Sequence, residues 1–307
     1  MGTAFAPCLF SPRLRPAAPV LLTLALLAVA IPQWAQAQAT LEKIKSRSQI
    51  NVGYRALAAP FSFHQTAEKP LGYSIEFCKP IIERLRQAAG NQKLPVRYIE
   101  TYVDARTRLL SEGSVDLLCE NVTDTPERRA RMDFSSPIFV DAIQVAVRSK
   151  DKITALDQLQ GKTIVGIDGT TVVPALERYA KSHALTWQHA KAVNADAALG
   201  QLQLGWAAGY ARYGVVLAAQ LAGLPDAGDY RVLPERLSVE PIAIAYRKGD
   251  AAMGALVNAS IKESMRSGAA QGWYEQWFLK PAKAGGKPLA TAMPAEMKAL
   301  FEAARAN

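Results

Sequence analysis

The stretch RTRLLSEGSVDLLCENVTDTPERR, residues 106–129, decides which fold this chain is expected to adopt. Its first part, RTRLLSEG, predicts a helix that ends at Gly113, because glycine is favoured just after the last helical turn. The apolar run VDLLC then predicts a buried strand. The polar segment ENVTDTPERR follows directly, so its hydrogen-bonding groups belong either to a solvated loop or to a ligand site at the strand end.

The same alternation of strand and helix continues on the N-terminal side of this stretch. QINVGYR (49–55) predicts a strand, SIEFCKPIIERLRQAAG (74–90) a helix, and VRYIE (96–100) a second strand. A β-α-β-α-β order is typical of a mostly parallel sheet flanked by helices. A long apolar segment, DAIQVAVRS (141–149), then predicts a strand that leaves this unit.

A second unit of helices and strands begins near residue 150. LQGKTIVGIDGTTVVPALERYAKS predicts a strand, a turn at 169–171 and a helix, and AAGYARYG (207–214) predicts another strand. VEPIAIAYRKGD (239–250) is a long apolar strand that can return the chain to the first unit. Two α/β lobes joined by two extended crossings are therefore expected, with a small ligand between them beside the strand ends.

The first 37 residues have the composition of a secretory signal peptide. Arg13 and Arg15 precede the apolar run PVLLTLALLAVAI, and the small residues of AQAQA (35–39) follow it. The apolar run of about 13 residues is short for a membrane span. An uncleaved anchor is the alternative, but we expect cleavage and export to the periplasm.

The net charge of the chain and the spacing of its histidines limit the ligands and partners that are expected. Removal of the signal peptide takes away two arginines and no acidic residue, so the formal net charge falls by two from +9 to +7. This charge favours anionic ligands or simply solubility. No dense Lys/Arg block with aromatic residues occurs, so nucleic acid is not an expected partner. His64, His183 and His189 are scattered without metal-binding spacing, so no metal or cofactor is expected.

Two cysteines remain once Cys8 has left with the signal peptide. Cys78 lies in a predicted helix, and Cys119 ends a predicted strand. An even pair in an exported protein predicts a disulfide, and a helix packed on a sheet can bring the two side chains together. Two buried free thiols are the alternative.

Nine segments, taken together in their order and spacing, carry further information. They are TLEKIKSRSQINVGYR, APFSF, GYSIEFCKPII, the stretch quoted first, FSSPIFV, LQGKTIVGIDGTT, YRKGD, WYEQWF and PAEMKALF. This set resembles the type II periplasmic solute-binding proteins of amino-acid ABC transporters, above all the glutamate/aspartate-binding group. The resemblance implies a two-lobed fold with residues 40–144 plus 240–307 in lobe 1 and residues 145–239 in lobe 2. It also implies a monomer that carries an amino acid or related small organic anion to an ABC permease in the inner membrane.

The resemblance assigns Arg128 to the α-carboxylate of the ligand. A guanidinium group supports this role, because its planar fork of donors matches a carboxylate with two parallel hydrogen bonds. Asn121 and Thr123 fall where the family places further donors to the ligand. Thr170 and Thr171 precede a predicted helix, where free N–H groups favour an anion. Plain capping of that helix is the alternative role for the two threonines.

Arg55 and Arg106 match positions where the glutamate/aspartate group carries basic residues toward a second acidic group of the ligand. One departure concerns Tyr213, which stands where the family usually has an aspartate that pairs with the ligand ammonium. Either Glu120 or Asp124 replaces this countercharge, or the ligand lacks an amino group. In the second case Tyr213 would stack on the ligand or donate its phenol.

An enzyme and a sensory receptor are the alternatives to a transport role. An enzyme similar to the periplasmic cyclohexadienyl dehydratases of this fold would need an acid, for which Glu120 beside Arg128 is a candidate. The sequence shows no His-paired nucleophile, metal set or phosphate loop, so no enzymatic activity is expected. A sensory receptor is disfavoured because no kinase or membrane segment follows the second unit.

Overall fold

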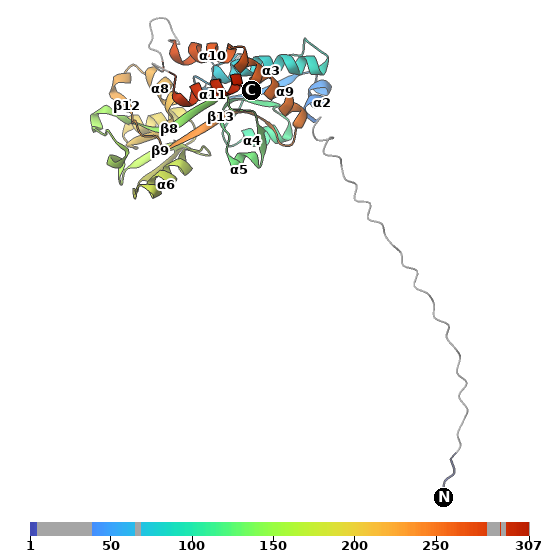
Figure 1. Ribbon diagram of the computed structural model, residues 1–307. Coiled ribbons are helices and arrows are strands. Elements are labelled where there is room, and N and C mark those ends of the chain that lie inside the picture. Colours follow the sequence, from blue (N-terminus) through green and yellow to red (C-terminus); the bar gives the residue numbers. More distant parts are fainter. Residues whose placement is uncertain (5–38, 65–68, 281–288, 290–292, 307) are drawn as a thin grey trace. The chain divides into compact units, whose positions relative to one another are not determined.

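The computed structural model describes residues 1–4, 39–64, 69–280, 289 and 293–306 (Figure 1). Apart from its first four residues, the predicted signal peptide (1–37) lies outside the described residues. All the helices and strands given below belong to one compact unit, Gln33–Asn307. Within the described part of the chain, no helix is both long and apolar enough to span a membrane.

The centre of this unit is a mixed sheet of ten strands, which confirms the predicted α/β class. We call β5, β1, β6 and β7 the first half of the sheet and β10, β9, β11 and β12 the second half; β8 and β13 link them. Within each half, neighbouring long strands run parallel. The strands are β1 (Ile50–Tyr54), β5 (Val96–Glu100), β6 (Leu117–Thr123), β7 (Met132–Phe134), β8 (Phe139–Arg148), β9 (Thr163–Ile167), β10 (Gln188–Ala192), β11 (Gly209–Tyr213), β12 (Tyr230–Val232) and β13 (Ser238–Arg247).

Strands β8 and β13 are the two extended crossings that the sequence predicts. Their first parts pair antiparallel with each other, from Phe139 opposite Ile242 to Ile143 opposite Ser238. The remainder of β8 pairs with β11, and the remainder of β13 pairs with β6. The chain therefore passes from the first half of the sheet to the second through β8 and returns through β13 (Figure 1).

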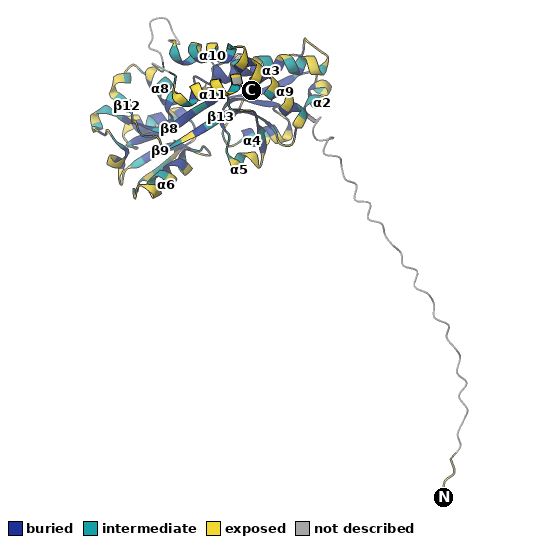
Figure 2. Ribbon diagram, viewed as in Figure 1, coloured by how far each residue is buried: buried dark blue, intermediate teal, exposed yellow. Residues whose placement is uncertain are grey.

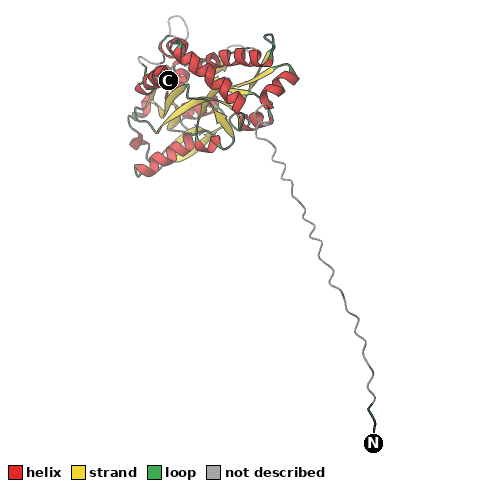
Figure 3. Ribbon diagram, turned by 45° about the vertical axis from the view of Figure 1, so that its right-hand side comes forward, coloured by secondary structure: helices red, strands yellow, loops and turns green. Residues whose placement is uncertain are grey.

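Helices lie on either side of the strands (Figure 3). In Figure 1, α3, α9, α10 and α11 lie above β8 and β13, and α4, α5 and α6 lie below them. The helices are α2 (Ala39–Arg47), α3 (Tyr73–Ala89), α4 (Arg106–Glu112), α5 (Pro126–Arg129), α6 (Val172–Ser182), α7 (Ala195–Leu204), α8 (Gly214–Ala222), α9 (Ala251–Arg266), α10 (Ala269–Tyr274) and α11 (Ala295–Ala306), with shorter helical turns at Ser149–Asp151, Leu156–Leu159, Ala227–Asp229 and Glu275–Leu279. A small antiparallel sheet of β2 (Leu57–Ala58), β3 (Ser62–His64) and β4 (Pro70–Leu71) stands beside the large one.

The core follows from the apolar patterns of the sequence. All five residues of β1 are buried, as expected of a parallel strand covered on both faces (Figure 2). Helix α3 presents an apolar face to the sheet and ends at Gly90, whose φ of 72° is the left-handed conformation that favours glycine. Phe61, in the middle of the segment APFSF, packs edge-on against Tyr73 and Phe139, so it belongs to the core.

A disulfide bond joins Cys78 of α3 to Cys119 of β6, as the sequence predicts. Both cysteines are fully buried. The hydroxyl of Ser74, one turn earlier in α3, donates to the carbonyl oxygen of Glu120 over 3.1 Å. The bond and this contact attach α3 to the part of β6 that leads into the polar segment quoted at the outset.

Strand β6 is longer than the sequence predicts. It does not end at Cys119 but continues to Thr123, because Val122 and Thr123 pair with Ala243 and Ile242 of β13 across a shift in register. The polar side chains of Glu120, Asn121 and Thr123 therefore project from a strand rather than from a loop, which fixes their directions.

Two carboxyl groups, those of Asp141 and Glu240, are buried where β8 and β13 pair. Asp141 of β8 is 8% exposed and lies opposite Glu240 of β13. Its oxygens accept hydrogen bonds from the backbone N–H of Ala142 (2.8 Å) and Val215 (3.3 Å). Burial raises the pKa of Asp141 to about 7, because the charged form loses its hydration; the two N–H donors oppose this shift.

This raised pKa predicts a pH-dependent stability. The folded protein holds the Asp141 proton more tightly than the unfolded chain does, so the stabilisation is present at acid pH and is lost as the pH rises from about 4 through 7. Asp141→Asn keeps an acceptor oxygen and removes the titration. Its free energy of unfolding should rise relative to the wild type by roughly 2 kcal/mol between pH 5 and pH 8.

Urea unfolding at the two pH values measures this change. Asp168→Asn is the matched control, since Asp168 is exposed and pairs with the surface residue Lys191, and its effect on the free energy of unfolding should be small. A difference for Asp141→Asn that is the same at pH 5 and pH 8 would contradict the prediction.

Candidate functional site

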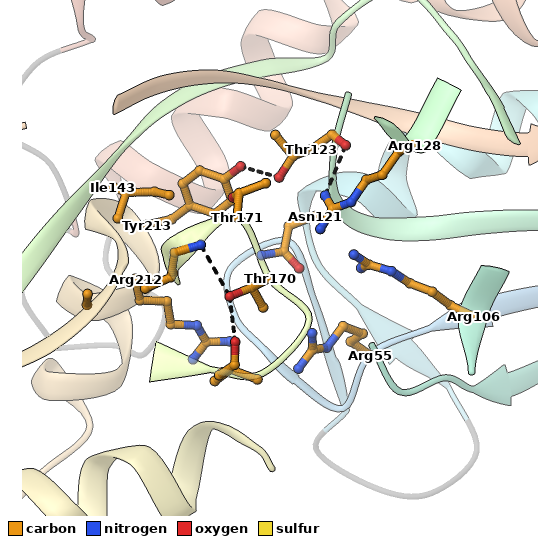
Figure 4. Close-up of a pocket in the computed structure, with 13 residues that line it drawn as sticks. Arg55, Arg106, Asn121, Thr123, Arg128, Ile143, Thr170, Thr171, Arg212 and Tyr213 are labelled. Carbon is orange, nitrogen blue, oxygen red and sulfur yellow. Dashed lines mark hydrogen bonds between the residues drawn. The ribbon is translucent and has the colours of Figure 1, made fainter. Parts of the chain in front are cut away.

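One cavity lies where strands of the two sheet halves end (Figure 4). Its empty volume is about 450 Å³, which includes space open to solvent. All eight residues that the sequence predicts as ligand contacts line it, together with five that were not predicted. The predicted residues are Arg55, Arg106, Asn121, Thr123, Arg128, Thr170, Thr171 and Tyr213, and the others are Ile143, Ile167, Val172, Ala211 and Arg212.

The topology explains why residues so far apart in sequence meet here. Arg55 follows β1, Thr123 ends β6, Tyr213 ends β11 and Thr170 follows β9. The carboxyl ends of parallel strands lie at one edge of a sheet, where ligands usually bind in open α/β folds. Both sheet halves turn this edge toward the same cavity.

Four arginine side chains line the cavity. Arg55, Arg106 and Arg212 are buried, and Arg128 is half-buried. Burial is the main cause that lowers the pKa of both Arg55 and Arg128 to about 10, and repulsion from Arg106 contributes to both shifts. A pKa of about 10 leaves these two guanidinium groups charged at pH 7. The cavity is therefore strongly cationic.

Arg106 has a carboxylate partner. Its Nη1 donates to Oε2 of Glu120 over 3.0 Å, and the other oxygen of Glu120 accepts from the Thr101 hydroxyl over 3.0 Å. Glu120 is fully buried, and both of its oxygens are engaged. The structure therefore does not offer Glu120 as the replacement countercharge that the sequence left open. Loss of either partner would destabilise the fold, because breaking a buried ion pair leaves an uncompensated charge.

The second open candidate, Asp124, is also engaged. Both of its oxygens accept from the guanidinium group of Arg129, on the exposed side of α5. Arg129 thus has the role of a surface charge with a local partner. Its neighbour Arg128 points the other way, into the cavity.

Arg128 is held by backbone carbonyl groups from both sheet halves. Its Nη1 donates to the Thr123 carbonyl oxygen (3.0 Å) and its Nη2 to that of Gly169 (3.4 Å). Helix α5 begins at Thr125, whose hydroxyl accepts from the Arg128 N–H over 3.3 Å. A guanidinium group has five N–H donors, so these two side-chain bonds fix its plane and leave donors for a ligand.

Tyr213 lines the cavity, and a chain of hydrogen bonds holds its side chain in place. Its hydroxyl lies 2.5 Å from the Thr123 hydroxyl and donates to Oε2 of Glu240 over 2.8 Å. Glu240 also accepts from the hydroxyls of Thr171 (2.6 Å) and Ser238 (2.9 Å). Burial raises the pKa of Tyr213 well above its usual value, with the nearby Glu240 charge as the next cause, so the side chain stays a neutral phenol.

The two threonines before α6 are bonded locally. The Thr170 hydroxyl donates to the Ile167 carbonyl (2.6 Å) and accepts from the Val172 N–H (3.4 Å), while Thr171 bonds to Glu240. Thr170 therefore has the capping role that the sequence left as an alternative. Asn121 differs, because among the described residues its buried Oδ1 has no hydrogen-bond partner. An unpaired polar atom that faces a cavity is a natural ligand contact.

Arg212 and Glu240 are the site residues that sequence reasoning missed. Arg212 donates from Nη2 to the Leu57 carbonyl oxygen over 2.7 Å and so connects β11 with the small sheet. It also lines a second, neighbouring cavity beside Leu57 and His64. An acidic residue inside the apolar segment VEPIAIAYR was the one available signal for Glu240. Among the described residues, no group of three or more potential metal-binding side chains occurs.

A cavity at the strand ends of two sheet halves, linked by two crossing strands, is the arrangement expected of a solute-binding protein. The family model for bacterial extracellular solute-binding proteins, family 3, matches residues 50–280, and the chain belongs to this family.

Individual proteins agree with this membership. The chain is 27% identical to a glutamate/aspartate import solute-binding protein of Salmonella typhimurium over 87% of its own length and 88% of that protein. It is 29% identical to an L-glutamate/L-aspartate-binding protein of Pseudomonas aeruginosa, with 85% and 87% covered. A solved solute receptor for L-cysteine of Neisseria gonorrhoeae superimposes with a TM-score of 0.69 at 25% identity, over 84% of this chain and 98% of the receptor.

Proposed function

We propose that the protein is the extracytoplasmic solute-binding component of an ABC importer and that it binds an amino acid or related small organic anion. The observation that carries this proposal is the cavity with four arginines, in which Arg128 is oriented by two backbone carbonyls and keeps free donors. Arg128 binds a carboxylate of the solute with its guanidinium fork. Arg55 and Arg106, with Asn121, Thr123, Thr170, Thr171 and Tyr213, complete the contacts.

Closure of two lobes around the solute is the second part of the proposal. Residues 40–144 plus 240–307 form one lobe, residues 145–239 form the other, and β8 and β13 act as the hinge. Hydrogen bonds from one proposed lobe to the other lie around the cavity. They include Arg128 to the Gly169 carbonyl, the Thr123 hydroxyl to Tyr213, and Arg212 to the Leu57 carbonyl.

The cellular setting follows from the family and from the chemistry of the chain. The protein is exported by its N-terminal signal peptide and acts in the periplasm as a monomer, where it presents the loaded form to a permease in the inner membrane. The Cys78–Cys119 bond supports this location, because structural disulfides persist in oxidising compartments. The protein has no enzymatic role in this proposal; the relatives described above are named as binding proteins.

Thermal unfolding in the presence of candidate solutes tests the proposal. The common amino acids and the four- to six-carbon dicarboxylic acids form the panel. A solute at about 100 times its Kd should stabilise the protein by about 2.7 kcal/mol, or roughly 5 to 10 °C in Tm. We expect a small set of anionic solutes to do so, and we expect Arg128→Gln to abolish the shift.

Two outcomes would contradict the proposal. One is the absence of any Tm shift across the panel. The other is turnover of prephenate or arogenate, followed by the appearance of product, which would identify a dehydratase instead of a transport protein. A shift without turnover supports the binding role.

A further inference from the structure

We infer that the solute is a dicarboxylate without an ammonium group, and that Tyr213 determines this preference. The inference rests on the proposed function and deepens it, because it concerns the chemistry of the solute in the same cavity.

The first argument is the balance of charge around the cavity. Four guanidinium groups line it, and among the described residues that line it none is acidic. Two buried carboxylates stand just behind this lining: Glu120, paired with Arg106, and Glu240, bonded to Tyr213. The four positive and two negative charges leave a formal charge of +2. Two carboxylates neutralise this charge, whereas a zwitterionic acidic amino acid supplies a net charge of only −1.

The second argument is the lack of a free carboxylate acceptor for an ammonium group, which carries a positive charge and three donors. Glu120 uses one oxygen for Arg106 and the other for Thr101. Glu240 accepts three hydroxyl hydrogen bonds, and two of the donors, Tyr213 and Thr171, themselves line the cavity and so lie between it and the carboxylate. Both carboxylates are thus already hydrogen-bonded to groups of the protein.

Several backbone acceptors at the cavity already have donors. The carbonyl oxygens of Thr123 and Gly169 accept from Arg128, and that of Leu57 accepts from Arg212. The other acceptors that the lining offers to an ammonium group, the Asn121 amide oxygen and the threonine hydroxyls, are neutral. An ammonium held by neutral acceptors among four guanidinium groups would lose its hydration without a countercharge.

The third argument is the arrangement of the arginines. In Figure 4, Arg128 lies beside Thr123 and Asn121, while Arg55 and Arg212 lie lower in the view, around Thr170. Arg212 contributes to the lowering of the pKa of Arg55, which indicates that these two charges are close to each other. Positive charge is therefore available at two places in the cavity, as a solute with a carboxylate at each end requires.

Tyr213 is the residue that decides between the two kinds of solute. An aspartate at this position would offer a carboxylate to an ammonium group, but the phenol is neutral and its proton is directed to Glu240. Tyr213→Asp is therefore expected to favour solutes with an amino group. Tyr213→Phe is the matched variant, because it keeps the ring and adds no charge.

Titration calorimetry with paired solutes tests the inference. Succinate and L-aspartate, glutarate and L-glutamate, and adipate and L-2-aminoadipate differ within each pair only by the amino group, so the series controls for chain length. In the pair that the wild type binds best, we expect the dicarboxylate to bind at least threefold more tightly. We expect Tyr213→Asp to reverse this order and Tyr213→Phe to keep it.

The outcomes separate the inference from the proposed function. An amino acid that binds as tightly as its dicarboxylate, or more tightly, overturns the inference and leaves the transport role intact, as does a solute with a single carboxylate as the best ligand. Failure of every solute, with no Tm shift for any of the wider panel, overturns both. If Tyr213→Asp does not fold, as judged by circular dichroism, the wild-type pairs decide the inference alone.

Discussion

Replacement of Arg128 by glutamine is expected to weaken solute binding by about 100-fold, or ~2.7 kcal/mol. The guanidinium group is positioned by the Thr123 and Gly169 carbonyls, so its free N–H groups are directed into the cavity before any solute arrives. Glutamine loses the charge and the paired donors, and it leaves a solute carboxylate desolvated without a partner. Titration calorimetry with the best solute of the panel measures the change in Kd.

Two further variants show whether the effect is specific. Arg129→Gln removes the neighbouring charge on the same helix, but Arg129 is exposed and pairs with Asp124, so the Kd should change by less than about twofold. Arg128→Lys keeps a positive charge without the planar fork and should bind with intermediate affinity. An Arg128→Gln protein that binds within threefold of the wild type would refute the assigned role of Arg128.

Removal of the Cys78–Cys119 disulfide is expected to lower the free energy of unfolding by about 2 to 4 kcal/mol. The cysteines are 41 residues apart, so the bond closes a long loop in the unfolded chain and reduces its conformational entropy. The double variant Cys78→Ala/Cys119→Ala avoids free thiols, and urea unfolding measures its stability.

The same variant should also bind its solute several-fold more weakly, because Cys119 lies in β6 just before Asn121 and Thr123. Wild-type protein treated with a reductant is the matched comparison and should resemble the double variant in both measurements. A double variant with the stability of the oxidised wild type would show that the bond does not stabilise the fold.

The alternation of helix and strand was predictable because strong local signals mark it. Gly90 and Gly113 end helices in the left-handed conformation, and the residues of β1 and of the apolar start of β6, residues 117–119, are buried. The edge strand β10 (Gln188–Ala192) was not predicted, since only its last residue is buried and its sequence, QHAKA, carries little apolar pattern. The extension of β6 to Thr123 depends on pairing with β13, more than 100 residues away, which no local signal contains.

The candidate site was predicted from a resemblance to a family. The prediction was therefore limited to residues at positions that the family uses. The eight predicted residues match family positions, and all of them line one cavity. Arg212 has no local signal that marks it as a site residue, because side chains alternate along a strand and adjacent residues such as Arg212 and Tyr213 do not usually face the same cavity. Glu240 was missed because its importance arises only from the fold, which brings β13 behind Tyr213. The sequence showed that a countercharge was absent at 213, but not that Glu120 and Asp124 already had partners.

A crystal structure of the protein with its tightest-binding solute tests the central claim most directly. We predict a solute in the cavity between β6 and β11, with oxygens of one carboxylate within hydrogen-bonding distance of the Arg128 guanidinium group. A solute bound elsewhere, or one in this cavity with Arg128 turned toward the solvent, would contradict the account.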